Sequence, residues 1–124
     1  MISLNEHQEQ CLVIAWCLKN ESKDPRLEMI FAIPNGLWSK NTGVARKAVA
    51  EGLKSGVPDL LLAVAAQGFN GLFVEMKREF KSSTPQVQKD WHRKLAKQGY
   101  KCEVCKGHKA AIRVIADYLA VEYV

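Results

Sequence analysis

The chain has 124 residues, and its 18 basic and 13 acidic side chains give a net charge of +5. This length is sufficient for one hydrophobic core, so we expect a single domain over residues 1–124. The longest apolar run is far shorter than the ~20 residues that span a bilayer, and the N-terminal residues lack a basic, then apolar, signal pattern. These features exclude a membrane-spanning class and predict a soluble, intracellular, cytoplasmic chain.

Residues 4–19 have the apolar spacing of an amphipathic helix. The predicted buried stripe contains Leu4, Cys11, Ala15 and Leu18, and Leu12, Ile14 and Trp16 widen it. Glu6 falls on the first turn of this helix. The polar segment 20–25 ends it.

A strand is expected over residues 27–33, where Pro34, Asn35 and Gly36 stop it. Residues 44–54 predict a second helix. Gly56 then connects this helix to the next strand.

A strand over residues 71–77 carries two charged side chains within an apolar sequence. Successive side chains of a strand point to opposite faces. The apolar residues therefore form one face, and Glu75 and Lys77 share the other. This pattern fits a solvated ion pair on an exposed edge strand about as well as it fits a functional site.

Asp59 lies just before the preceding strand, which is expected over residues 60–64. Pro58 biases Val57 toward an extended conformation, so a strand can begin here. The loop between the two strands has glycine at two points and suits a turn between antiparallel strands. Asp59 and Glu75 are then expected to converge. Two adjacent carboxylates are a good site for Mg²⁺ or Mn²⁺, which prefer hard oxygen ligands. Lys77 would limit the repulsion between them and face a phosphate.

The last third of the chain predicts a helix, a strand and a second helix. Thr84 is the expected N-cap of the first helix and Pro85 its first residue, and this helix continues to residue 98. A strand over residues 100–105 and a helix over residues 108–119 complete the order α-β-α-β-β-α-β-α.

Other ligand patterns receive little support. Cys102 and Cys105 form a C-x-x-C, but an offset of three along a strand sends them to opposite faces, whereas a closed zinc site needs four converging ligands. Buried free thiols are the expectation. The histidines His7, His92 and His108 form no ligand motif and are interpreted as surface or helix-end residues. The chain has no phosphate-binding loop, so no nucleotide cofactor is expected.

Basic side chains concentrate between residues 77 and 109. They are Lys77, Arg78, Lys81, Lys89, Arg93, Lys94, Lys97, Lys101, Lys106 and Lys109. A cluster of this kind favours a polyanion, because phosphate contacts supply much of the affinity of proteins for DNA. Each single lysine is equally explained by a solvated helix face.

The motifs resemble those of the VRR-NUC family, the virus-type replication and repair nucleases of the PD-(D/E)xK superfamily. Pro58-Asp59 is similar to the PD motif and Glu75-Met76-Lys77 to the ExK motif. Similar motifs flank them in the family's order. These are Glu6 with Gln10, Pro34-Asn35-Gly36, Thr84-Pro85 with Gln88 and Trp91, and Gly99-Tyr100.

The resemblance implies a restriction-endonuclease-like α/β core with a small mixed sheet flanked by helices. It implies an Mg²⁺ or Mn²⁺ ion held by Asp59, Glu75 and the backbone carbonyl of Met76. Glu6 would complete the acidic shell, and Glu9 is its rival because only the Glu-x-x-x-Gln spacing selects Glu6.

Lys77 would position the attacking water or the scissile oxygen, and Gln88 would assist at the site. Candidate DNA contacts are Asn35, Arg78, Lys81, Lys89 and Arg93. The resemblance also suggests a homodimer that cuts branched DNA, as Holliday junction resolvases do, in a phage or bacterial context of replication, recombination or repair. Two alternatives stay open, which are a basic DNA-binding module with an inactive nuclease fold and a zinc-stabilised interaction domain.

Overall fold

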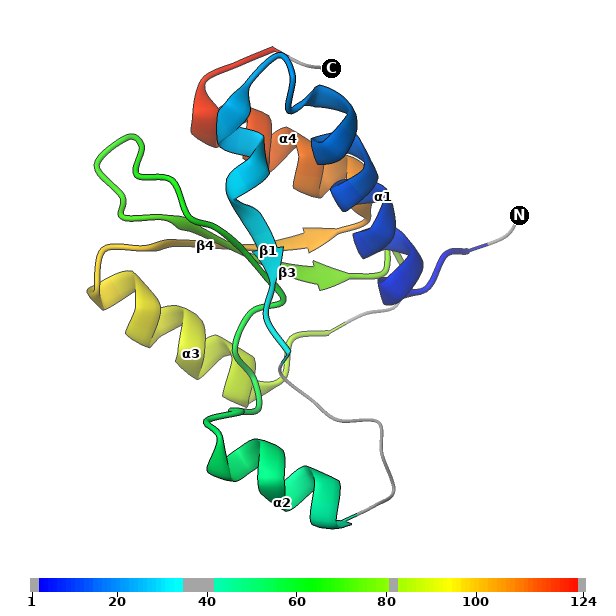
Figure 1. Cartoon of the computed structure of the whole chain (residues 1–124), viewed down its shortest axis with the longest axis vertical. Helices are drawn as coiled ribbons and strands as arrows, with labels where there is room; N and C mark the ends of the chain where they lie inside the picture. Colours follow the sequence, from blue (N-terminus) through cyan, green and yellow to red (C-terminus); the bar gives the residue numbers. More distant parts are fainter. Residues whose placement is uncertain (1–2, 35–41, 81–82, 123–124) are drawn as a thin grey trace.

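A computed structural model describes residues 3–34, 42–80 and 83–122. In chain order these residues form α1 (Glu6–Asn20), the 3₁₀ helix η1 (Pro25–Met29), β1 (Ile30–Ala32), α2 (Thr42–Ala50), β2 (Leu60–Leu62), β3 (Leu72–Lys77), α3 (Gln86–Lys97), β4 (Lys101–Lys106) and α4 (His108–Leu119) (Figure 1). Apart from η1, this is the predicted order of helices and strands.

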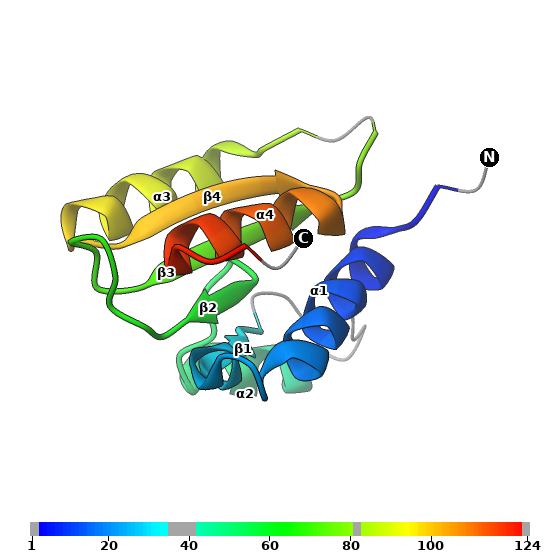
Figure 2. The same cartoon turned by 90° about the horizontal axis from the view of Figure 1, so that it is seen from above.

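The strands form one mixed sheet in the order β1-β2-β3-β4 (Figure 2). The pairs β1–β2 and β2–β3 are antiparallel, whereas β3 and β4 are parallel. A parallel pair needs a crossover connection, and α3 supplies it. Strand β3 therefore lies inside the sheet, between two neighbours.

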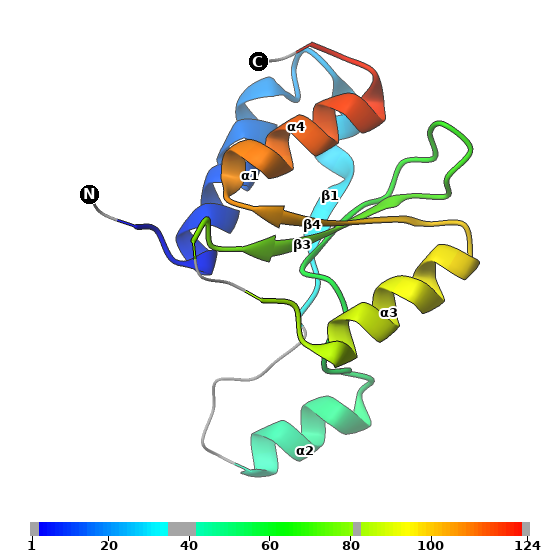
Figure 3. The same ribbon diagram turned by 180° about the vertical axis from the view of Figure 1, so that it is seen from behind.

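The helices cover the two faces of the sheet unequally. Helices α1 and α4 lie together over one face, and α3 lies over the opposite face (Figures 1 and 3). Helix α2 stands apart from the sheet in both views and has no buried residue. The result is a three-layer arrangement in which each side of β3 is packed against a different helix.

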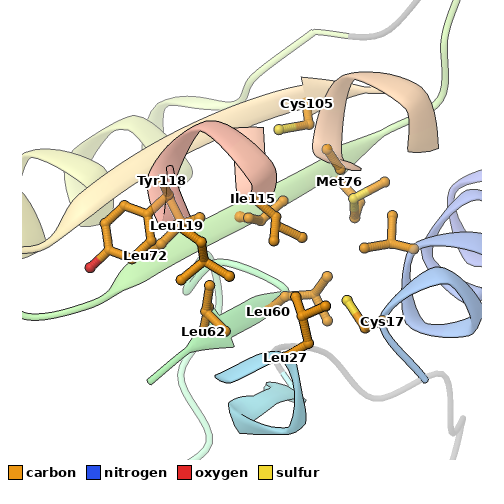
Figure 4. Close-up of a cluster of buried hydrophobic side chains, with 13 residues drawn as sticks. Cys17, Leu27, Leu60, Leu62, Leu72, Met76, Cys105, Ile115, Tyr118 and Leu119 are labelled. Carbon is orange, nitrogen blue, oxygen red and sulfur yellow. The ribbon is translucent and has the colours of Figure 1, made fainter. Parts of the chain in front are cut away.

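The hydrophobic core fills the space between the sheet and the α1 and α4 layer (Figure 4). Leu60 and Leu62 of β2 and Leu72 and Met76 of β3 point into it and are at most 1% exposed. Burial of each such side chain contributes roughly 1.5–3 kcal/mol to folding. Because side chains alternate along β3, the predicted apolar face is confirmed, and Glu75 and its same-face neighbours turn toward α3.

The predicted buried face of α1 is confirmed only for Ile14 and Trp16, which are partly buried against the core. The buried apolar residues are Val13 and Cys17, whereas Leu12 and Leu18 are 40% and 62% exposed. Cys11 and Ala15 are also exposed, and Leu4 is half-buried. The helix has apolar residues all round, so periodicity does not select one face, and a polar contact fixes the choice. Buried Glu9 accepts hydrogen bonds from the backbone N–H of His108 at the start of α4 and, at 2.9 Å, from Nδ1 of His108.

Two of the boundaries that differ from expectation lie at the start of an element. The strand expected over residues 27–33 is shortened to β1, because Pro25 and the N-cap Asp24, which accepts from the Arg26 backbone N–H at 3.1 Å, begin η1 instead. Helix α3 starts one residue late, with Pro85 at its N-cap position and no side-chain cap.

The turn that joins β2 to β3 is centred on Gln67 and Gly68. Their φ angles of +53° and +86° suit a two-residue hairpin connection. Ala66 and Phe69 exchange backbone hydrogen bonds of 3.1 and 2.8 Å across it. The expected antiparallel connection is confirmed. No helix in the described ranges is long and apolar enough to cross a membrane.

Candidate active site

The pairing of β2 with β3 places Asp59 beside Glu75. Leu60 is paired with Val74 in the antiparallel register, so the residue before Leu60 comes opposite the residue after Val74. The Asp59 Oδ2 atom accepts a 2.7 Å hydrogen bond from the backbone N–H of Met76. This bond holds the carboxylate against β3, and the predicted convergence of the two acids is confirmed.

Glu75 and Lys77 are not a solvated surface pair. Their exposed fractions are 2% and 6%, because they lie on an inner strand under α3. Ionised side chains are rarely buried without a partner or a bound ion. The edge-strand interpretation is therefore wrong, and the charges require another explanation.

Helix α3, which lies over this face of the sheet (Figure 3), brings two side chains to these charges. Gln88 Oε1 accepts a 2.7 Å hydrogen bond from Lys77 Nζ. His92 Nε2 lies 3.7 Å from Glu75 Oε1. Trp91 Nε1 donates to the Ser55 carbonyl at 3.1 Å, which ties α3 to the segment that precedes β2.

The environment strongly favours the protonated form of Glu75. Its pKa is raised from 4.5 to about 9, first by burial, then by its hydrogen bond to Asp59 and the negative charge of Asp59. The positive charge of Lys77 opposes this shift, and the charge of Glu6 adds to it. The pKa of His92 is lowered by burial and by the Lys77 charge, while Asp59 opposes that change.

Two buried polar atoms lack a hydrogen-bond partner among the described residues, and they face each other. They are Glu75 Oε1 and His92 Nε2. Such atoms in native proteins usually indicate an ion or water that completes them. The carboxylates of Asp59 and Glu75 are hard oxygen donors, so they fit the Mg²⁺ or Mn²⁺ ion implied by the sequence.

The structure distinguishes Glu6 from its rival. Glu9 is buried and committed to the N-terminus of α4, whereas Glu6 is exposed on the first turn of α1. The charge of Glu6 acts on Glu75, so it lies within electrostatic reach. Within the described ranges, no three acidic, histidine or cysteine side chains already form a metal-sized cluster. Met76 has its side chain in the core, which leaves only its backbone to contribute.

The predicted DNA contacts fall into two groups. Asn35 and Lys81, together with Gly36 of the Pro-Asn-Gly motif, lie outside the described residues. Arg78, Lys89 and Arg93 are exposed. Arg93 Nη2 already pairs with Asp90 Oδ1 at 3.0 Å, which neutralises part of its charge.

The cysteines form no common site. All four are free thiols, and Cys105 packs in the core beside Met76 while Cys102 pairs with Phe73 on the α3 face. The predicted opposite orientation of the C-x-x-C pair is confirmed. This arrangement removes the support for a zinc-stabilised domain.

Sequence reasoning missed His92, which it placed at the surface. The signal was its spacing, since His92 follows Gln88 by four residues and therefore shares its helix face. Because Gln88 contacts Lys77, the side chain one turn later on the same face, His92, is directed at Glu75.

A mixed sheet flanked by helices, with two acids and a lysine converging on its central strands, is typical of nuclease domains. The family model described as "VRR-NUC domain" matches residues 3–109, so the chain belongs to the VRR-NUC family. A solved structure titled "VRR_NUC domain protein" is similar, with 30% sequence identity and a TM-score of 0.81, and the match covers 98% of this chain and 93% of that one. A search of curated proteins gave no match. The chain is therefore a nuclease domain with the expected mixed α/β fold.

Proposed function

We propose that residues 1–124 act as one domain that hydrolyses DNA phosphodiester bonds with a divalent metal ion. The observation that carries the proposal is the burial of Glu75 with an unpartnered oxygen, beside Asp59 and Lys77. A purely structural domain gains nothing from a buried acid beside a second, half-buried acid, because their repulsion and the desolvation of Glu75 oppose folding. A metal site gives them a role.

Asp59 and Glu75 would hold Mg²⁺ or Mn²⁺, and Glu6 and the backbone carbonyl of Met76 are the proposed further ligands. When bound, such an ion lowers the pKa of a coordinated water and stabilises negative charge on the phosphate. The Met76 N–H holds Asp59 in place through its 2.7 Å bond, so one ligand is oriented before any ion arrives.

Lys77 is the proposed contact to the scissile phosphate or the attacking water. Its ammonium is held at 2.7 Å by Gln88 Oε1, which restricts a flexible side chain to one position. A fixed cation in a buried site stabilises developing phosphate charge more strongly than a solvated one. Gln88 therefore acts by positioning Lys77.

The proposed substrate is branched DNA such as a four-way junction. Exposed Arg78 and Lys89 flank the site and suit phosphate contacts, and Asn35 and Lys81 are retained as candidates from the sequence. The net charge of +5 favours association with a polyanion. The proposed setting is the cytoplasm of a bacterium or phage-infected host, where replication, recombination and repair produce such DNA.

The proposed homodimer has a candidate surface on α1. Leu4, Cys11, Ala15 and Leu18, here called the α1 stripe, border two shallow grooves of about 440 and 270 Å³. Two copies of α1 packed antiparallel across a two-fold axis would bury both stripes.

Cleavage assays test the proposal. A panel of junction, flap, nicked and linear DNAs is incubated with Mg²⁺ or Mn²⁺ and with chelator, using wild type, Asp59→Asn, Lys77→Ala and the exposed-lysine control Lys23→Ala. We expect metal-dependent cutting by wild type and Lys23→Ala alone. Cutting that survives Asp59→Asn or Lys77→Ala would refute the assignment. Tight DNA binding without cutting under any condition would instead support a DNA-binding module with an inactive nuclease fold.

A further inference from the structure

We propose that His92 Nε2 is a metal ligand beside Glu75 Oε1, and that this nitrogen makes the site selective for Mn²⁺ over Mg²⁺. The inference rests on the proposed metal-dependent function and adds a residue outside the Pro-Asp and Glu-x-Lys motifs. It also specifies the chemical class of the ion, which is a first-row transition metal.

The two atoms are unusual in this molecule. Among the described residues, Glu75 Oε1 and His92 Nε2 are the buried side-chain polar atoms without a hydrogen-bond partner. Leaving such an atom unsatisfied is unfavourable, because it loses its bonds to water and gains no partner. Their separation of 3.7 Å is too long for a hydrogen bond between them. A single third atom between them would satisfy both.

The position of His92 is fixed by its helix. Gln88, one turn earlier on α3, is anchored to Lys77, and Trp91 is anchored to the Ser55 carbonyl. These two contacts determine how α3 faces the sheet. The imidazole, whose side chain is 16% exposed, is thereby directed at a Glu75 carboxylate that is 2% exposed.

The spacing and the donor types suit a transition ion. Zinc bonds to imidazole nitrogen and to carboxylate oxygen are about 2.0–2.2 Å long, so a separation of 3.7 Å is short enough for one ion with bonds of similar length to contact both atoms at an angle. Mg²⁺ prefers oxygen ligands and keeps its waters, whereas Mn²⁺ belongs to the first-row transition series, whose ions bind sites that mix nitrogen and oxygen donors. The Glu75 oxygen and the His92 nitrogen therefore form a better pair of donors for Mn²⁺ than for Mg²⁺.

An alternative explanation is a direct ion pair between a protonated His92 and Glu75. In that arrangement both nitrogens of the ring carry protons and neither binds metal. The two explanations differ in one observable, which is nitrogen coordination of the bound ion. Pulsed EPR of Mn²⁺ measures this directly through the coupling of the electron spin to a ligand nitrogen.

The experiment uses the full, untagged chain loaded with one equivalent of Mn²⁺ without DNA. We expect a nitrogen coupling that changes isotope pattern when histidine is labelled with ¹⁵N. The coupling should disappear in His92→Asn and persist in His7→Asn, which removes an exposed imidazole on α1. Calorimetry should show Mn²⁺ affinity weakened in His92→Asn by at least the ~10-fold that loss of an outer-shell partner costs, and a smaller change for Mg²⁺.

The outcomes separate this inference from the proposed function. Mn²⁺ that binds wild type, is lost in Asp59→Asn and shows no nitrogen coupling would overturn the role of His92 and leave the carboxylate site intact. Mn²⁺ binding that is indifferent to Asp59→Asn would overturn the proposed function itself. The labelled wild-type spectrum reports histidine coordination without any variant, and its persistence in His7→Asn and in His108→Asn assigns the coupling to His92 even if the His92 variant does not fold.

Discussion

Replacing Glu75 by glutamine is expected to stabilise the metal-free protein at neutral pH. The pKa of this carboxyl is raised from 4.5 to about 9 by burial and by Asp59. The folded state thus binds the proton more tightly than the unfolded state. The resulting stabilisation is fully present below the unfolded pKa and is lost as the pH rises through about 9.

The size of the effect follows from linkage. One pH unit within this window corresponds to ~1.4 kcal/mol, so wild type should lose about 3 kcal/mol from this group between pH 5 and pH 7. Glutamine keeps the shape and does not ionise. The difference in free energy of unfolding between Glu75→Gln and wild type should therefore grow by about 3 kcal/mol over the same range.

The assay is urea unfolding in chelator at several pH values, with the exposed-acid variant Glu28→Gln as control. We expect Glu28→Gln to follow wild type at every pH. Addition of Mn²⁺ at pH 7 should raise the stability of wild type and leave Glu75→Gln unchanged. If the free energies of unfolding of wild type and Glu75→Gln change in parallel with pH in chelator, the pKa of Glu75 is not raised in the folded protein.

Three further predictions concern other parts of the molecule. Gln88→Leu removes the acceptor of the buried Lys77 ammonium and should lower the free energy of unfolding in urea by roughly 1–3 kcal/mol. Gln86→Leu on the same helix should lower it by less than about 0.5 kcal/mol, and equal losses would contradict the positioning role. Burial raises the pKa of Cys17 and Cys102 to about 11 and of Cys105 to about 12. Mass spectrometry should therefore find these thiols unmodified by a thiol reagent at pH 8 until the chain unfolds, and rapid modification of these thiols in the folded protein would refute their placement. Leu18→Glu should convert the proposed dimer to a monomer in light scattering, whereas the control Val49→Glu, at a similarly exposed position on α2, should leave it a dimer. A dimer that persists in Leu18→Glu would exclude the α1 stripe as its interface.

The order of the elements was predictable because the strands have clear chemical signatures. Alternation in residues 72–77 identified both faces of β3, and α4 begins at His108 and ends at Leu119 as predicted. The positions of Asp59 and Glu75 followed from a short antiparallel connection. Local patterns of this kind depend on few contacts, so the sequence contains most of what determines them.

The face of α1 and the role of His92 depend on tertiary packing. Leu12, Val13 and Ile14 are consecutive apolar residues, so spacing alone does not decide which of them is buried. The contact between Glu9 and the start of α4 decides it, and it joins residues 99 positions apart. His92 acquires its significance only when α3 is placed on the sheet, because no motif marks it.

Single-turnover cleavage of a four-way DNA junction in Mn²⁺ by wild type and Asp59→Asn is the most direct test of a metal-dependent nuclease site on β2 and β3. Asparagine retains an acceptor for the Met76 N–H, so the local structure is preserved while the carboxylate charge is lost. We predict a cleavage rate at least ~10²-fold lower at saturating protein, with DNA affinity unchanged. An undiminished rate for Asp59→Asn would contradict the assignment of the site.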